Sequence, residues 1–223
     1  MSAVLKLQGA SFRYAGAKGP ALKDLTFEVH RGEVVALAGV PGSGTSTLLL
    51  VAGGYAPRLV GGEITGHREL LAAHPAIVFA APWTQLTGLC HTVASEVAFG
   101  PASHGLPRER IRDIVTRQLH RLGVAHLAER DPVTLSGGEL QRVIVASALA
   151  LEPDLLLLDD PAAELDPGAA DDLYDLLKTV AAEGAAVLVA TPDTTRAARA
   201  APRAIVLDHG RIAADGPSSR VLA

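Results

Sequence analysis

Apolar and polar residues alternate in two early segments of the chain, residues 4–7 and 25–29, as they do in strands with one buried face. Other segments are continuous apolar runs, which are typical of strands that are buried on both faces. These runs span residues 34–38, 76–80, 155–158, 186–190 and 204–207. The first pattern predicts half-buried strands, and the second predicts the inner strands of a sheet.

Apolar residues recur at helical spacing in the segments between these runs. The clearest case is residues 107–129, where Pro107 is placed to open a helix. Further helices are predicted from about 46 to 52, 139 to 151 and 168 to 183. Because strands and helices alternate, the pattern favours an α/β fold with a mostly parallel sheet. The helical stretch from about 84 to 150 interrupts this alternation and can form a separate lobe.

Length and composition narrow the classes of protein that fit. A chain of 223 residues suits one domain that carries a subdomain. With 48% hydrophobic residues it can bury enough apolar surface to fold. A net charge of −4 gives no basic field for nucleic acid, so we expect no nucleic-acid partner. The single cysteine, Cys90, excludes a disulfide framework.

Two further absences bear on location and on metal binding. No apolar run reaches the roughly 18 residues that a membrane span needs, and the N-terminus lacks a signal peptide, which predicts a cytosolic location. Attachment to a membrane through a partner stays open. The eight histidines show no spacing typical of metal ligands.

A glycine-rich segment follows the apolar run 34–38 and precedes a predicted helix. Glycines in this setting let backbone N–H groups wrap phosphates at a helix N-terminus. The segment matches the P-loop pattern G-x-x-x-x-G-K-[ST] except that the lysine is Thr45. The candidate nucleotide-binding residues are Gly39, Gly42, Ser43, Gly44, Thr45, Ser46 and Thr47. Losing the lysine costs roughly 1.5–3 kcal/mol and weakens nucleotide binding about 10- to 100-fold. A glycine turn without a ligand is the alternative.

The run 155–158 ends in Asp159, which is the form of a Walker B strand. Asp159 and the hydroxyl of Ser46 are candidate ligands of Mg²⁺. A strand that ends in aspartate is common, so this signal is weak without the P-loop.

The string LSGGE upstream of this strand is more specific. A serine and two glycines at a helix start present a hydroxyl and bare N–H groups to an anion. Its residues are Leu135, Ser136, Gly137, Gly138 and Glu139. The string resembles the signature motif of ATP-binding-cassette (ABC) ATPases.

The resemblance covers essentially the whole chain. Its motifs follow in order as Tyr14, the P-loop, a Q-loop region at 78–86, the signature, Walker B, a D-loop with Asp166, and an H-loop region near 190–193. Residues 96–101 and 105–107 are similar to the corresponding segment of the energy-coupling-factor or cobalt-type importer subgroup of this family.

This resemblance implies a fold and an assembly. The fold is a RecA-like P-loop NTPase core with an α-helical subdomain at about 84–150 and an N-terminal antiparallel β region, all in one domain over 1–223. The ligands implied are ATP and Mg²⁺. Two such subunits join head to tail, so that each ATP lies between one subunit's P-loop and the other's signature. The pair docks on an integral membrane subunit, at the cytoplasmic face of the cell membrane.

Residue by residue, the match to the family is uneven. Tyr14 occupies the position of the aromatic that stacks on adenine, and Ser46, Asp159 and Asp166 are kept. Four positions that serve the γ-phosphate are altered. They are Thr45 for the P-loop Lys, Ala80 for the Q-loop Gln, Asp160 for the Walker B Glu, and Pro192 for the H-loop His. Gln85, five residues after Ala80, matches a second family glutamine that could substitute.

The altered positions all belong to the site that this chain's own P-loop would form, whereas the signature serves a partner's site. We therefore expect a degenerate site here, with Asp160 a weak base and hydrolysis weak or absent, and a working site across a heterodimer. The signature glycines argue for this, since a core does not need them. The alternatives are an active ATPase with an unusual site, a non-catalytic regulatory or scaffold domain, and a soluble ABC ATPase of translation or DNA repair.

Overall fold

The computed structural model describes residues 2–222. Its larger sheet has six strands in the order β5-β6-β7-β3-β8-β9. Neighbouring strands run parallel except at the β8–β9 hairpin. The strands are β3 (Val34–Ala38), β5 (Pro75–Val78), β6 (Leu155–Asp159), β7 (Ala186–Ala190), β8 (Arg203–Asp208) and β9 (Arg211–Pro217). The continuous apolar runs therefore form the predicted parallel strands.

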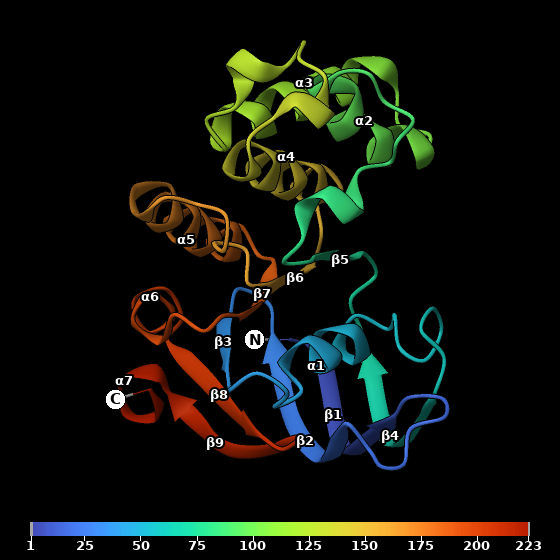
Figure 1. Cartoon of the computed structure of the whole chain (residues 1–223), viewed down its shortest axis with the longest axis vertical. Helices are drawn as coiled ribbons and strands as arrows, with labels where there is room; N and C mark the ends of the chain where they lie inside the picture. The colour runs from blue at the N-terminus through green and yellow to red at the C-terminus, as the bar shows by residue number, and fades with distance from the viewer. Residues whose placement is uncertain (1, 223) are drawn as a thin grey trace.

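A second sheet is antiparallel and has the order β2-β1-β4. Its strands are β1 (Ala3–Arg13), β2 (Leu22–His30) and β4 (Glu63–Leu70). The buried faces of β1 and β2 share one apolar core with the P-loop helix α1 (Thr45–Ala52) and the larger sheet. Figure 1 shows α1 between the two sheets. The expected N-terminal antiparallel region is confirmed.

Three helices stand together at the end of the molecule away from the antiparallel sheet (Figure 1). They are α2 (Val93–Ser103), α3 (Arg108–Arg121) and α4 (Gly137–Ala150). The short 3₁₀ helices η1 (Pro82–Gln85), η2 (Ala125–Leu127) and η3 (Pro132–Thr134) connect them. Along the larger sheet lie α5 (Pro167–Ala182), α6 (Thr194–Ala200) and α7 (Ser218–Val221). A second apolar core joins α2–α5 to the sheet.

The helix predicted over 107–129 is shorter in the structure, where α3 ends at Arg121. Gly123 adopts a left-handed conformation at φ 67°, which a glycine reaches without strain. The N–H of Val124 then donates to the carbonyl of Leu119 at 2.9 Å and closes the helix end. In the described part of the chain, no helix is both long and apolar enough to cross a bilayer.

Candidate nucleotide-binding site

The glycine-rich loop joins β3 to α1, with Gly44 at the helix N-cap. Gly44 has φ 106° and Gly42 has φ 85°, and both values favour glycine. No side chain of the described residues caps α1, which leaves N–H groups of its first turn for an anion. This geometry is what the P-loop spacing predicts.

The loop is also held from behind. Ser43 is almost fully buried, and its N–H donates to the carbonyl of Val40 at 2.9 Å. Its own carbonyl accepts from the N–H of Gly210, in the β8–β9 turn, at 2.9 Å. A Cβ at Gly39 would lie 2.7 Å from the carbonyl oxygen of Leu207 and would collide with Ser43, so only glycine fits there. The sheet thus fixes the loop in place.

The two candidate magnesium ligands come together although they lie far apart in the sequence. The hydroxyl of Ser46, in the first turn of α1, lies near enough to Asp159 at the end of β6 to act on its pKa. Burial raises the pKa of Asp159, and the Ser46 hydroxyl partly offsets this rise. A hydroxyl and a carboxylate are hard oxygen donors, and two protein ligands suit a Mg²⁺ that also binds nucleotide phosphates. The pair therefore fits Mg²⁺, which would neutralise phosphate charge there.

Asp160, the candidate weak base, follows Asp159 where the chain leaves the sheet. Its φ is 46°, and its N–H donates to the carbonyl of Ala190 at 2.8 Å. The pKa of Asp160 is raised by burial first and then by the charges of Asp159 and Asp193. Asp159 and Asp193 are therefore close enough to act on Asp160.

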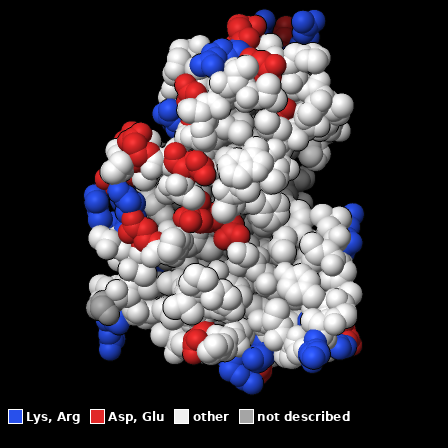
Figure 2. Space-filling view, in the orientation of Figure 1, with Lys and Arg blue, Asp and Glu red and all other residues white. Residues whose placement is uncertain are grey.

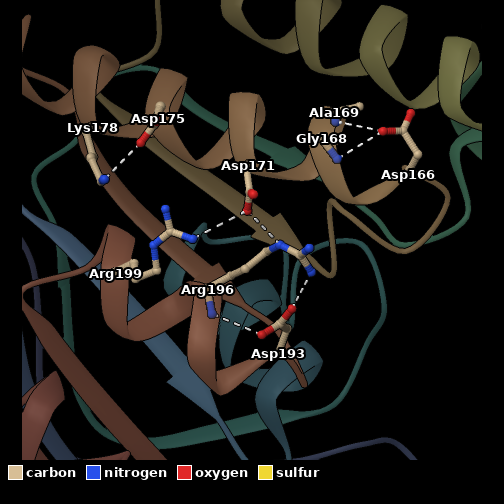
Figure 3. A network of polar contacts seen from close by, with 9 residues as sticks. All are labelled: Asp166, Gly168, Ala169, Asp171, Asp175, Lys178, Asp193, Arg196 and Arg199. Carbon is tan, nitrogen blue, oxygen red and sulfur yellow. Dashed lines mark hydrogen bonds and ion pairs between the residues drawn. The ribbon is translucent and has the colours of Figure 1, made fainter.

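The segment after β7 contains Pro192, which is exposed, followed by Asp193. Asp193 caps α6 by accepting from the N–H of Arg196 at 3.0 Å, and its carboxylate pairs with the Arg196 guanidinium. The same guanidinium donates through Nε to Asp171 of α5 at 2.9 Å (Figure 3). Arg199 lies 3.9 Å from Asp171. Arg196 is thus engaged by two carboxylates.

These contacts leave the site short of positive charge. The loop 39–47 contains no charged residue. Figure 2 shows acidic side chains grouped on the face between α5 and α1. No sequence motif marks Asp193, Arg196 or Asp171, because their contacts join elements that are distant in the chain. The Asp-x-x-Arg spacing of a capped helix was the one local signal.

Tyr14 lies beside α1, where its hydroxyl shares a hydrogen bond with the Thr47 hydroxyl at 3.1 Å. Its ring meets Phe12 edge-on, with centroids 4.9 Å apart and an angle of 82° between the rings. Tyr14 is therefore next to the P-loop helix, and its contact with adenine remains a prediction.

The Q-loop region begins at the end of β5. Ala80 is exposed and offers no polar side chain. The side-chain oxygen of Gln85 accepts from the N–H of Phe79 at 2.6 Å, while Gln85 Nε2 is buried without a hydrogen-bond partner among the described residues. Gln85 therefore stabilises this loop from within.

The signature forms the start of α4, with Ser136 at the N-cap. The N–H and the hydroxyl of Ser136 both donate to Glu139 Oε2 at 2.8 Å, and the Glu139 N–H donates to Ser136 Oγ at 3.4 Å. Hydrogen bonds from the Ser136 backbone and side chain lower the pKa of Glu139. This reciprocal capping box fixes the first turn of the helix.

The D-loop packs beside the signature. A Cβ on Gly138 would lie 2.9 Å from the Glu164 carbonyl oxygen, and one on Gly137 would lie 2.5 Å from Glu164 Oε2. Gly138 therefore lies against the backbone of the D-loop, whereas the neighbour of Gly137 is the end of an exposed, flexible side chain. Asp166 caps α5 by accepting from the N–H groups of Gly168 and Ala169 at 3.0 Å each (Figure 3). No described hydrogen bond or ion pair joins 135–139 to the P-loop.

Comparison with models of known protein families shows which family the chain belongs to. The family model described as ABC transporter matches residues 22–163. The chain belongs to the ABC transporter family. Membership implies an ATP-binding domain, with Mg²⁺ as its usual companion.

Relatives of this ABC domain carry transport names. It is 38% identical to the nickel import ATP-binding protein NikO of Rhodobacter capsulatus, over all of this chain and 92% of that protein. It is 35% identical to the energy-coupling factor transporter ATP-binding protein EcfA of Methanothermobacter thermautotrophicus, over 96% of this chain and 70% of that one. Some relatives are much longer, and the chain spans 37% and 30% of two of them.

Solved structures agree with the fold. The ABC domain superposes on cbiO1 from Clostridium perfringens, described as part of the ABC transporter complex cbiONQ, with a TM-score of 0.85 and 29% sequence identity. The match covers 99% of this chain and 91% of that one.

Proposed function

We propose that this chain is an ATP-binding subunit of an energy-coupling-factor-like importer, that its own ATP site is degenerate, and that its signature completes the site of a second ABC subunit. The observation that carries the proposal is the charge around the P-loop. The charges of Asp159 and Asp193 act on Asp160, just after the Walker B strand, and Arg196 is engaged by Asp193 and Asp171.

Electrostatics disfavours a terminal phosphate in this setting. A unit negative charge about 6 Å from an ionised carboxylate meets roughly 3 kcal/mol of repulsion at an effective dielectric constant of about 20. A P-loop lysine would oppose this repulsion, but Thr45 carries no charge. The pair Ser46 and Asp159 favours residual Mg-nucleotide binding, so we infer weak binding rather than none.

Hydrolysis of ATP needs a base and charge-stabilising groups in addition to the residues that bind the nucleotide. Asp160 is one methylene shorter than glutamate, so its carboxylate stops short of the position from which a glutamate would act on the attacking water. Pro192 has neither a side-chain proton nor a backbone N–H to offer the phosphate. Several parts of one charge-stabilising arrangement are therefore missing together, and their effects compound.

The signature, by contrast, keeps the Ser-Gly-Gly start of a helix. Ser136 is the N-cap and donates its own N–H and hydroxyl to Glu139, so the helix N-terminus and the two glycines are what it offers an anion. Asp166 caps the helix that follows the adjacent D-loop. A head-to-tail partner would present its own P-loop to this surface.

A membrane subunit is the other inferred partner, with this chain at the cytoplasmic face of the membrane. Support comes from a cavity of about 360 Å³ between β5, η1, α2 and α4. Tyr55, Phe79, Phe99 and Ile144 line it, and Phe99 is 39% exposed. Trp83 in η1 is 58% exposed. An apolar segment of a membrane subunit would cover these aromatics.

The proposal is tested by ATP turnover of the purified chain and of the complex that the tagged chain brings down from its own cells. We expect turnover near background for the chain alone and clear turnover for the complex. A chain that hydrolyses ATP as fast alone as in the complex would overturn the proposal and favour an active, unusual site.

A further inference from the structure

A cavity of about 350 Å³ lies where the end of α3 meets α4 and α5, apart from the P-loop. The three helices meet in the upper half of Figure 1. Its basic lining comes from His120, Arg121 and Arg142, and its apolar lining comes from Leu122, Leu173 and Leu176. The volume is within the range of small-molecule sites.

Arg142 is the unusual member of this lining. It is half-buried, and its Nε is buried without a hydrogen-bond partner. Among the described residues no carboxylate lies within 4 Å of its guanidinium, in contrast to the half-buried Arg121, Arg196 and Arg203. Burying the Nε–H of Arg142 without a partner is costly, so an anion that accepted from it would be stabilising.

The nearby carboxylates are already occupied. Arg142 acts electrostatically on Glu139 and Asp166, but Glu139 accepts from Ser136 and Asp166 accepts from the start of α5. Asp172 also lines the cavity and forms no ion pair there. Glu139 and Asp166 therefore act on Arg142 only from a distance, and no described carboxylate forms an ion pair with it.

Arg121 adds a second donor. Its Nη1 contacts Glu183 at 3.1 Å, while its Nη2 is buried without a partner. The carbonyls at the end of α3 are taken by the N–H groups of Leu122, Gly123 and Val124, so they do not compete for these donors. Arg121 and Arg142 both line this cavity, and each has one buried guanidinium nitrogen without a partner, which suits a carboxylate or a phosphate.

We propose that this cavity binds a small organic anion, with its carboxylate or phosphate on Arg121 and Arg142 and its apolar body against Leu122, Leu173 and Leu176. Bound there, the anion ties α4 to α5. These helices carry the signature and the D-loop, so the site is placed to regulate how they face a partner. The inference does not rest on the state of the P-loop.

The test uses benzoate, phenyl phosphate and inorganic phosphate with the full chain. Binding is followed through the side-chain Nε–H signal of Arg142 in nitrogen-15 NMR spectra, identified by its loss in Arg142→Gln. We expect benzoate or phenyl phosphate to shift this signal, and the stronger of the two tells whether the site prefers carboxylate or phosphate. Inorganic phosphate should bind more weakly, because it lacks an apolar body.

Variants then locate the site by calorimetric titration. Arg142→Gln and Arg121→Gln should each weaken binding by about tenfold or more. Arg117→Gln is the matched control, since Arg117 is on the same helix and paired with Glu152 but does not line this cavity. No shift of the Arg142 signal at about 20 mM probe, or equal affinity in wild type and Arg121→Gln, would overturn the proposal. If Arg142→Gln fails to fold, the calorimetric comparison of Arg121→Gln with wild type and with Arg117→Gln decides.

Discussion

The sharpest consequence of the charge around the P-loop is that one substitution should restore much of the nucleotide affinity. Thr45 is the first residue of α1, follows Gly44 and is half-buried beside the anion-binding turn. No residue of 39–47 is charged, so Thr45→Lys would introduce the loop's first positive charge. We expect the variant to bind MgATP more tightly than the wild type.

The magnitude follows from the bond that the lysine would form. A hydrogen bond to a charged group contributes about 1.5–3 kcal/mol, which corresponds to roughly 10- to 100-fold in affinity. Lysine would also oppose the field of Asp159 and Asp160, so the gain should shrink as salt is raised. AMP, which lacks the outer phosphates, should gain little.

Calorimetric titration of MgATP into wild type, Thr45→Lys and Thr45→Gln measures this effect. The glutamine variant is the control, because it adds a long polar side chain without charge. Equal tightening in the two variants would show that length rather than charge matters, and no tightening in Thr45→Lys would refute the electrostatic reasoning.

Three further outcomes test the described contacts. The pKa of Asp160 is raised in the fold, so ionised Asp160 destabilises the protein, an effect that is absent below about pH 4 and grows as pH rises. Asp160→Asn should therefore raise the melting temperature at pH 7 and lose this gain near pH 4. An equal gain at both pH values would contradict the raised pKa. Arg196→Gln should lower the melting temperature at pH 7 more than Arg199→Gln, because Arg196 bonds two carboxylates whereas Arg199 lies 3.9 Å from one. Equal melting temperatures for the two variants would mean that the contacts of Arg196 do not stabilise the fold. Ser136→Ala removes the N-cap of α4 and should cost about 1 kcal/mol in urea unfolding, whereas no cost would mean that the capping box is not formed in solution.

Local sequence patterns predicted most of the parallel sheet, because strands that are buried on both faces need continuous apolar residues. The run 155–158 became β6, and the run 186–190 became β7. The end of α3 was missed, because the apolar spacing continues past Arg121 while the backbone turns at Gly123. Helix ends depend on cap geometry, which periodicity does not encode.

In the candidate site, too, some features could be predicted from local sequence patterns and others could not. The P-loop was predictable because its glycines serve a local backbone shape. The link between Ser46 and Asp159 came from reading the P-loop and Walker B patterns together, since no single local pattern joins them. The contact of Arg196 with Asp171 and the approach of Glu164 to the signature glycines depend on how α5 packs, and neither has a local signature.

The central claim is that this chain acts through its signature and not through its own P-loop. The most direct measurement is ATP turnover of the assembled complex with Gly137→Asp or Ser46→Ala in this chain. Val133→Asp is the matched control, because it puts the same charge on a 75% exposed residue near the signature. We expect Gly137→Asp to abolish ATP turnover of the complex, whereas Ser46→Ala and Val133→Asp should each retain most of it. Loss of turnover in Ser46→Ala, with Gly137→Asp still active, would contradict the account and assign the chemistry to the altered P-loop.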